Sequence, residues 1–151
     1  MLQRFERFSL AISEINRCWH KLAAEEMANY GLNSPHALYL STLYQYEDGV
    51  TAAKLAELCW KDKADVSRMI SILEQKGLVQ KETAGGNKYR ALIKLTDEGR
   101  TAAAHVRNRA AFAVELAGAG LSDENRETFY SALGLITSNL QTLSKQGLPR
   151  E

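Results

Sequence analysis

Cysteine is scarce in this 151-residue sequence, which contains only Cys18 and Cys59. Two cysteines are too few for a disulfide framework, and no CxxC pair provides the usual spacing of a metal site. We therefore expect two reduced thiols in an intracellular protein, with no metal and no cofactor.

Long apolar runs are also missing. No stretch of about 18 consecutive apolar residues is present, so the sequence predicts no membrane-spanning helix and no membrane partner. Charged residues are scattered through residues 1–20, which excludes the apolar segment of a signal peptide. We expect a cytoplasmic protein.

The motifs of common enzyme classes are absent too. The sequence has no GxSxG, no HExxH, no Walker loop and no clustered acid pair with a supporting motif. His20, His36 and His105 are scattered, and Gly85-Gly86 lies in a predicted hairpin rather than before a helix. We expect no enzyme and no catalytic residues.

What the sequence does contain is helical periodicity on both sides of a short central unit. Apolar residues at three- and four-residue spacing, with capping residues and glycines at the ends, predict helices. These cover residues 3–30, 35–47, 96–117 and 122–145. Ser34, followed by Pro35 at the first helical position, and Ser122 are predicted caps, and Thr51 and Asp62 or a near neighbour begin the two central helices. The outer helices carry apolar stripes that the small central unit cannot bury.

The central unit has the element order of a winged helix–turn–helix. Two helices, 52–59 and about 62–76, are followed by alternating segments at 78–83 and 91–95 that predict a hairpin with its tip at 85–89. The fold class is therefore mainly α with a small β-hairpin wing. Residues 34–100 form the winged helix–turn–helix domain, and 96–117 form a long connecting helix.

The second of the two central helices is the predicted recognition helix. Val66, Met69, Ile70 and Leu73 form its inner face, which leaves small and hydrogen-bonding residues outside. Such side chains suit close contact with base edges, and an arginine can pair with guanine or bind a phosphate. The predicted DNA-contacting residues are Lys63, Ala64, Asp65, Ser67, Arg68 and Ser71.

Local charge favours the same surface. Residues 61–90 contain seven basic and four acidic residues, an excess of +3 in a chain of net charge +1. The hairpin tip adds Asn87, Lys88, Tyr89 and Arg90 as candidate contacts to phosphates or to the minor groove. The alternatives are an ordinary solvated charged face and a polar surface turn.

The ordered series of motifs in residues 51–99 resembles the multiple antibiotic resistance regulator (MarR) family of transcription factors. The matching stretches are Leu55-Ala56-Glu57-Leu58, Lys63-Ala64-Asp65-Val66-Ser67-Arg68-Met69-Ile70, Leu73-Glu74-Gln75-Lys76-Gly77-Leu78-Val79 and Ile93-Lys94-Leu95-Thr96-Asp97-Glu98-Gly99. The resemblance implies a homodimer whose outer segments, 1–33 and 118–151, form a helical dimerisation region. It also implies binding to double-stranded DNA at a pseudo-palindromic operator.

The wing departs from the family pattern. Family wings usually carry Asp-x-Arg at the tip, whereas the matching positions here are Asn87 and Tyr89, on either side of Lys88. This departure has three alternative consequences: lower affinity for DNA, a different groove contact, or a wing that mainly contacts phosphates.

The resemblance also implies regulation. Family members often respond to small aromatic compounds, and Trp19, His20, His36, Tyr39 and Tyr44 are candidate lining residues; the alternative is core or interface packing. Some relatives sense peroxide through a cysteine in the first helix, where Cys18 lies.

The sequence thus predicts a sequence-specific transcriptional regulator, a homodimeric repressor released from DNA by a small effector. One alternative is a winged-helix protein-interaction module that does not read DNA. The other is a redox-sensing regulator based on Cys18.

Overall fold

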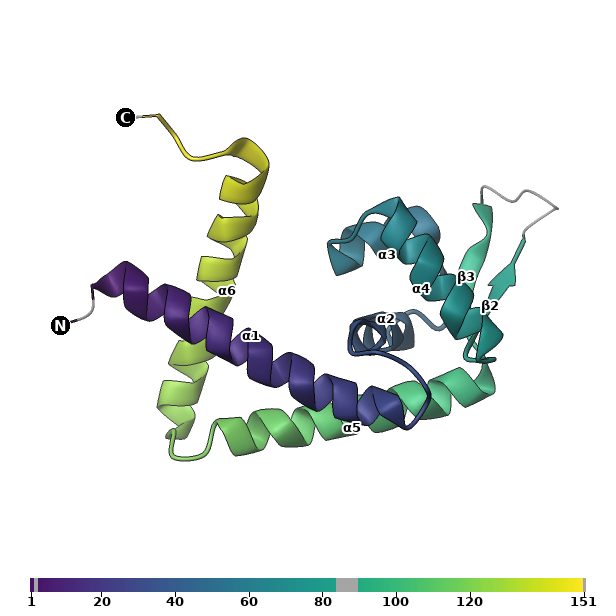
Figure 1. Ribbon diagram of the computed structural model, residues 1–151, viewed down its shortest axis with the longest axis horizontal. Coiled ribbons are helices and arrows are strands. Elements are labelled where there is room, and N and C mark those ends of the chain that lie inside the picture. The colour runs from purple at the N-terminus through teal and green to yellow at the C-terminus, as the bar shows by residue number, and fades with distance from the viewer. Residues whose placement is uncertain (2, 84–89, 151) are drawn as a thin grey trace. The chain divides into compact units, whose positions relative to one another are not determined.

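The computed structural model describes residues 1, 3–83 and 90–150 (Figure 1). It is mainly helical, with six helices and a small antiparallel sheet in that part of the chain. The elements are α1 (Arg4–Ala28), α2 (Pro35–Tyr44), β1 (Val50–Thr51), α3 (Ala52–Cys59), α4 (Lys63–Gln75), β2 (Val79–Glu82), β3 (Leu92–Leu95), α5 (Asp97–Ala117) and α6 (Asp123–Gln146). The predicted fold class, a winged helix within a helical chain, is confirmed.

The chain divides into two compact units, Met1–Ala110 and Ala111–Glu151, with the boundary inside α5. The first unit holds the hydrophobic core. Side chains from α2, α3, α4 and all three strands meet there, including Leu40, Leu55, Ile70 and Ile93. In the second unit, no residue of α6 is buried.

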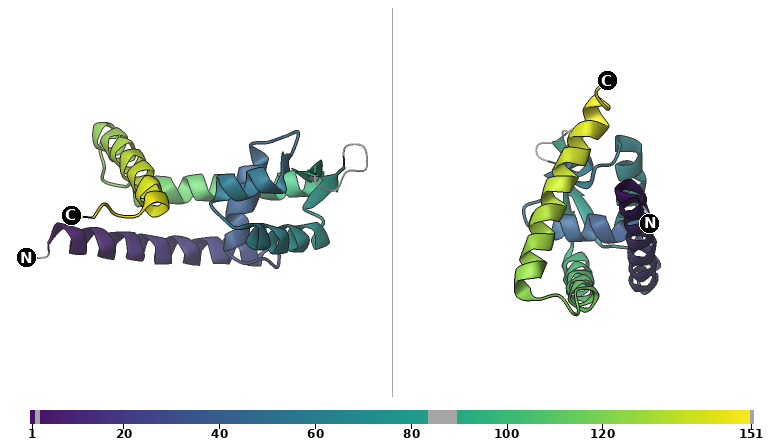
Figure 2. Two further views of the ribbon diagram at one scale, coloured as in Figure 1. Left: turned by 90° about the horizontal axis from the view of Figure 1, so that it is seen from above. Right: turned by 90° about the vertical axis from the view of Figure 1, so that its left-hand side faces the viewer.

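Helix α1 is long and uninterrupted, and its N-terminal turns extend beyond α2, α3 and α4 (Figures 1 and 2). Met27, near its C-terminal end, is its one buried residue. Most of the apolar stripe predicted from the sequence is therefore exposed to solvent in a single chain.

Three predicted helix starts are confirmed by side-chain caps. Thr51 Oγ1 accepts a hydrogen bond from Lys54 N at 3.2 Å, and Asp62 Oδ1 accepts one from Asp65 N at 2.7 Å. Ser122 caps α6 in the same way. Each cap satisfies a backbone N–H that the first helical turn leaves without a partner.

The prediction that Ser34 caps α2 is wrong. Its backbone is already helical (φ −50°, ψ −39°) and its side chain makes no capping hydrogen bond. The Ser34 hydroxyl lies instead 3.3 Å from His20 Nδ1. Proline does begin the helix, as predicted, but α2 ends at Tyr44 rather than near residue 47.

The sheet has three strands, one more than the sequence predicted. Strand β1 is only two residues long, and it pairs antiparallel with β3 through Val50 opposite Ile93 and Thr51 opposite Leu92. The predicted hairpin pairs β2 with β3. The order β1-β3-β2 therefore joins the hairpin to the start of α3. The predicted hairpin tip, 85–89, lies outside the described residues.

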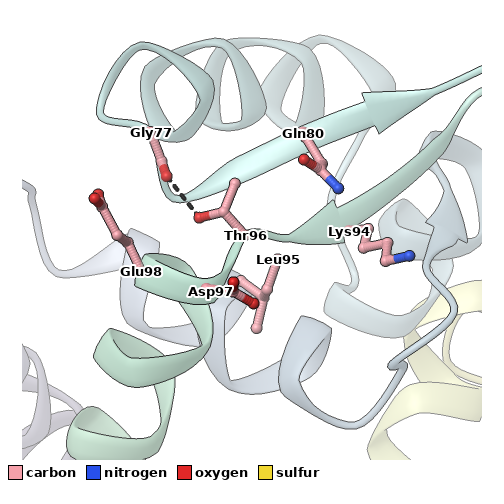
Figure 3. A pocket seen from close by; sticks show the side chains of 7 residues that line it. All are labelled: Gly77, Gln80, Lys94, Leu95, Thr96, Asp97 and Glu98. Atoms are coloured by element: carbon pink, nitrogen blue, oxygen red, sulfur yellow. Dashed lines mark hydrogen bonds between the residues drawn. The ribbon is translucent and has the colours of Figure 1, made fainter.

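A tight junction connects the end of α4 to the start of α5. Thr96 Oγ1 donates to the carbonyl of Gly77 at 2.6 Å and accepts from Gly99 N at 3.0 Å, and Thr96 N donates to Leu78 O at 3.0 Å. Figure 3 shows Thr96 facing Gly77 at this point. The buried Gly99 leaves room for the Leu78 backbone, because a Cβ atom there would lie 1.8 Å from Leu78 O.

We predict that Gly99→Ala destabilises the protein by about 2–4 kcal/mol, because the clash is with backbone rather than with a flexible side chain. Urea denaturation measures the change in the free energy of unfolding. Gly134→Ala in α6 is the matched control: an added Cβ there meets nothing within 4 Å, and the change should stabilise the helix by about 0.5–1 kcal/mol. Equal stabilities of the Gly99 variant and the wild type would contradict the predicted clash.

Candidate nucleic-acid interface

Helix α4 has one buried and one exposed face. Val66, Ile70 and Leu73 are buried in the core, at three- and four-residue spacing. The opposite side is exposed and carries five of the predicted contact residues, Lys63, Ala64, Ser67, Arg68 and Ser71. The sixth, Asp65, is half-buried. These residues share the exposed surface of one helix, with its positive N-terminal end beside them.

Asp65 is the most connected polar residue on α4. Its Oδ2 accepts a hydrogen bond from Tyr39 Oη at 2.7 Å, and its Oδ1 accepts one from Arg68 Nη2 at 3.3 Å. The hydroxyl of Tyr39, and then the Arg68 guanidinium, lower the pKa of the Asp65 carboxyl. The carboxylate is therefore ionised at neutral pH and has a partner on each oxygen.

Tyr39 comes from α2 and is fully buried. Burial, with the neighbouring Asp65 carboxylate, raises the pKa of its phenol, so Tyr39 is a neutral donor. The sequence predicted Tyr39 as a candidate effector contact and did not indicate a hydrogen bond between Tyr39 and α4. No local signal shows this contact, because 26 residues separate Tyr39 from Asp65.

The turn between α3 and α4 contains a residue that the sequence analysis missed. Trp60 ends α3 with φ +55° and ψ +44°, a left-handed conformation that favours glycine. Its side chain is 55% exposed. A large aromatic residue in this conformation is uncommon, and only Lys61 separates it from the α4 cap at Asp62.

The basic residues around α4 are exposed. Lys61, Lys76, Lys81 and Arg90 all face solvent, and Lys94 pairs with Glu82 across the hairpin at 3.4 Å. Arg90 lies just before β3. The other three predicted wing contacts, Asn87, Lys88 and Tyr89, lie outside the described residues. Among the described residues 61–83 and 90, six basic side chains, two of them arginines, face four acidic ones, an excess of +2.

A surface hollow lies at the base of the hairpin, beside the junction of α4 and α5 (Figure 3). It is lined by Gly77, Gln80, Lys94, Leu95, Thr96, Asp97 and Glu98. The lining mixes a lysine with two acids and includes no residue predicted as a contact.

The five candidate effector residues occupy three different environments. Trp19 and His20 are exposed on α1, whereas His36 and Tyr39 are buried in α2. Tyr44 is half-buried, and the guanidinium carbons of Arg100 and Arg107 lie 5.2 and 5.0 Å from its ring centre. Both contacts have cation–π geometry and connect α2 to α5.

His36 is the buried polar residue of this group. Its Nδ1 accepts a hydrogen bond from Asn33 N at 3.1 Å, and its Nε2 has no hydrogen-bond partner among the described residues. Burial lowers the pKa of the imidazole, with smaller opposing effects from Asn33 and Asp65. The ring is therefore held neutral in the folded state.

Both cysteines are free thiols. Cys18 is exposed, 3.7 Å from Arg17 Nη2 and 3.6 Å from Glu14 Oε1. His20, two residues further along α1, contacts the Ser34 hydroxyl. Cys59 is buried, its Sγ lies 3.6 Å from Thr42 Oγ1, and burial raises the pKa of its thiol.

Among the described residues, no group of three or more His, Cys, Asp or Glu side chains comes together in a way that could hold a metal ion. None of the helices in that part of the chain is both long and apolar enough to cross a membrane.

Comparison with known proteins finds the same fold in solved structures and a family model that matches the centre of this chain. The model of the MarR family matches residues 32–88. An uncharacterised HTH-type transcriptional regulator of Bacillus subtilis, YybA, is 27% identical over 130 residues, which cover 86% of each chain. A MarR transcriptional regulator from Methanosarcina mazei has a TM-score of 0.82 at 21% identity, with 91% of this chain and 99% of that chain covered. A MarR-family regulator from Listeria monocytogenes, solved with a 26mer DNA, also has a TM-score of 0.82 at 21% identity and covers 100% and 99%.

We predict that protonation of His36 destabilises the fold. Because the folded-state pKa is lowered, the unfolded chain binds more protons, so stability falls as the pH drops from about 7 to about 5. One proton limits this slope to about 1.4 kcal/mol per pH unit. Urea denaturation across this range measures it. His36→Gln should flatten the dependence, whereas His20→Gln on the exposed face of α1 should leave it unchanged. A slope that persists in the His36 variant would assign it to other groups.

Proposed function

We propose that this chain, whose residues 32–88 match the model of the MarR family, is a MarR-family transcriptional regulator: a sequence-specific DNA-binding homodimer that represses transcription until a small molecule releases it. The chain is a regulator and not an enzyme. The family model covers α2 to β2, which includes the whole helix–turn–helix. A DNA partner also favours the cytoplasm as its location.

The exposed face of α4 is the observation that carries the DNA-binding proposal. Ala64, Ser67 and Ser71 are small enough for the helix to approach base edges, and Arg68 is 67% exposed with a guanidinium that suits guanine or phosphate. The Listeria structure with DNA has the same fold at full coverage of this chain. In this proposal α4 enters the major groove, and Arg90 contacts the DNA beside it, at a phosphate or in the minor groove.

The homodimer is supported by exposed apolar stripes on α1 and α6. Side chains that are each at least 36% exposed recur along both helices. They are Phe5, Phe8, Ile12, Ile15 and Trp19 on α1, and Phe129, Ile136, Leu140 and Leu143 on α6. Helices of this length gain most of their stability by burying such a face, so we propose that a second copy covers it. A two-fold dimer would place two α4 helices about 34 Å apart, one DNA turn.

Release by a small aromatic effector is the finer part of the proposal. The Tyr44 ring has two guanidiniums near it, and His36 Nε2 has no hydrogen-bond partner among the described residues. These polar and aromatic groups belong to α2, which packs against α4. The exposed thiol of Cys18, with Arg17 beside it, favours oxidation as the alternative signal.

We predict that Arg68→Ala lowers affinity for the preferred DNA site by about 5- to 150-fold, because one base contact is lost. Duplexes selected from a random library by the wild type provide the site, and titration measures binding. Lys21→Ala, which removes an equal charge from α1, should bind normally. If the wild type binds no duplex even at low salt, the protein-interaction module becomes the better proposal. Normal binding by the Arg68 variant would remove that residue from the interface.

We predict that Leu140→Glu shifts the protein from dimer to monomer, because it places a charge in the middle of the α6 stripe. Sedimentation equilibrium measures the association constant. Leu148→Glu is the control, since Leu148 is 81% exposed and follows the end of α6. A monomeric wild type would contradict the dimer directly.

A further inference from the structure

One polar chain links the buried core to the exposed face of α4. It begins at the hydroxyl of Tyr39 in α2, passes through both oxygens of the Asp65 carboxylate, and ends at the guanidinium of Arg68. The two oxygens are used by different partners, at 2.7 and 3.3 Å. The backbone N–H of Asp65 is also held, by the carboxylate of Asp62.

Tyr39 is fully buried, so it cannot touch DNA itself. Its hydrogen bond fixes the rotamer of Asp65, because a short bond to an ionised carboxylate is among the stronger kinds. Asp65 is half-buried, and its side chain is only 22% exposed. The carboxylate is therefore tied to the rigid core and not free to follow Arg68.

Arg68 has the opposite surroundings. Its side chain is 67% exposed, and among the described residues its polar contact is with the Asp65 carboxylate. A long arginine loses considerable rotamer freedom when it binds, and a partner that orders it beforehand reduces that cost. One guanidinium nitrogen contacts Asp65, which leaves further N–H groups for a base edge.

The same arrangement explains how an acid can lie in a DNA interface. An unpaired carboxylate would repel the phosphate backbone. Here the phenol hydroxyl and the guanidinium take up both oxygens. In this arrangement Asp65 contacts Tyr39 and Arg68. From its position on α4, the sequence predicted a direct contact between Asp65 and DNA.

We propose that Tyr39 and Asp65 are positioning residues that set sequence specificity by fixing Arg68 for one base pair. The inference rests on the proposed DNA-binding function and deepens it. It assigns a role in DNA sequence specificity to Tyr39, which is buried in the protein core and belongs to α2 rather than α4.

The test compares the DNA sites selected by the wild type and by Tyr39→Phe, which removes one hydroxyl and keeps the buried ring. We expect about tenfold weaker binding to the wild-type site. Binding to random duplexes, and its salt dependence, should change less than about twofold, since the basic residues are intact. The base preference lost by the Tyr39 variant should be the one lost by Arg68→Ala.

Tyr30→Phe is the matched control, because Tyr30 is half-buried against the same core and makes no hydrogen bond through its hydroxyl among the described contacts. It should keep the wild-type preference. A double variant, Tyr39→Phe with Arg68→Ala, separates positioning from general packing. Positioning predicts no further loss of selectivity beyond Arg68→Ala alone, whereas a packing role predicts an additional loss on all duplexes.

The outcomes distinguish the two proposals. A wild type that selects no DNA sequence overturns the proposed function. A wild type that selects a sequence, together with a Tyr39 variant that keeps the same preference and affinity, overturns only the positioning role. Asp65→Asn provides a second variant, expected to lose the same base preference as Tyr39→Phe.

Discussion

The burial of Val66, Ile70 and Leu73 is the contact on which the rest of the structure depends. These three side chains hold one face of α4 against α2 and α3, so the remaining positions of a regular helix must face solvent. Each end of the helix is also held. Asp62 caps the start, and Thr96 holds the Gly77 carbonyl just beyond the C-terminal end. A helix that is fixed along one face and at both ends has a backbone with little conformational freedom. Recognition of a base edge requires such a rigid support for the side chains that make the contacts.

The sequence predicted features that depend on neighbouring residues. Thr51, Asp62 and Ser122 cap the helices that they were expected to start, because capping needs only the residue and the N–H groups that follow it. Helical periodicity correctly separated the buried residues of α4 from the exposed ones. Features that depend on distant residues were missed. Strand β1 has only two residues, and its pairing with β3 leaves no periodic pattern.

The candidate site shows the same division. The exposed residues of α4 followed from the period of the helix, but the hydrogen bond between Asp65 and Tyr39 did not, because Tyr39 lies on α2. Trp60 was overlooked since no propensity rule places tryptophan in a left-handed turn. The five candidate effector residues were predicted as one group because each has an aromatic ring. Packing of α2 buries His36 and Tyr39 and leaves Trp19 and His20 of α1 outside, which only tertiary structure decides.

The short strand β1 has a consequence for self-association through backbone pairing. It pairs with Leu92 and Ile93 on one side of β3 while β2 pairs along the other side, so only the short Lys94-Leu95 end of β3 has a side without a strand in the described sheet. The outer edges are left to β1, which is two residues long, and to β2, whose Gln80, Lys81 and Glu82 are polar and exposed. Short and charged edges are poor templates for adding another chain's strand. Addition of another chain's strand to this sheet is therefore disfavoured, which leaves the exposed apolar faces of α1 and α6 as the contact surfaces of the proposed homodimer.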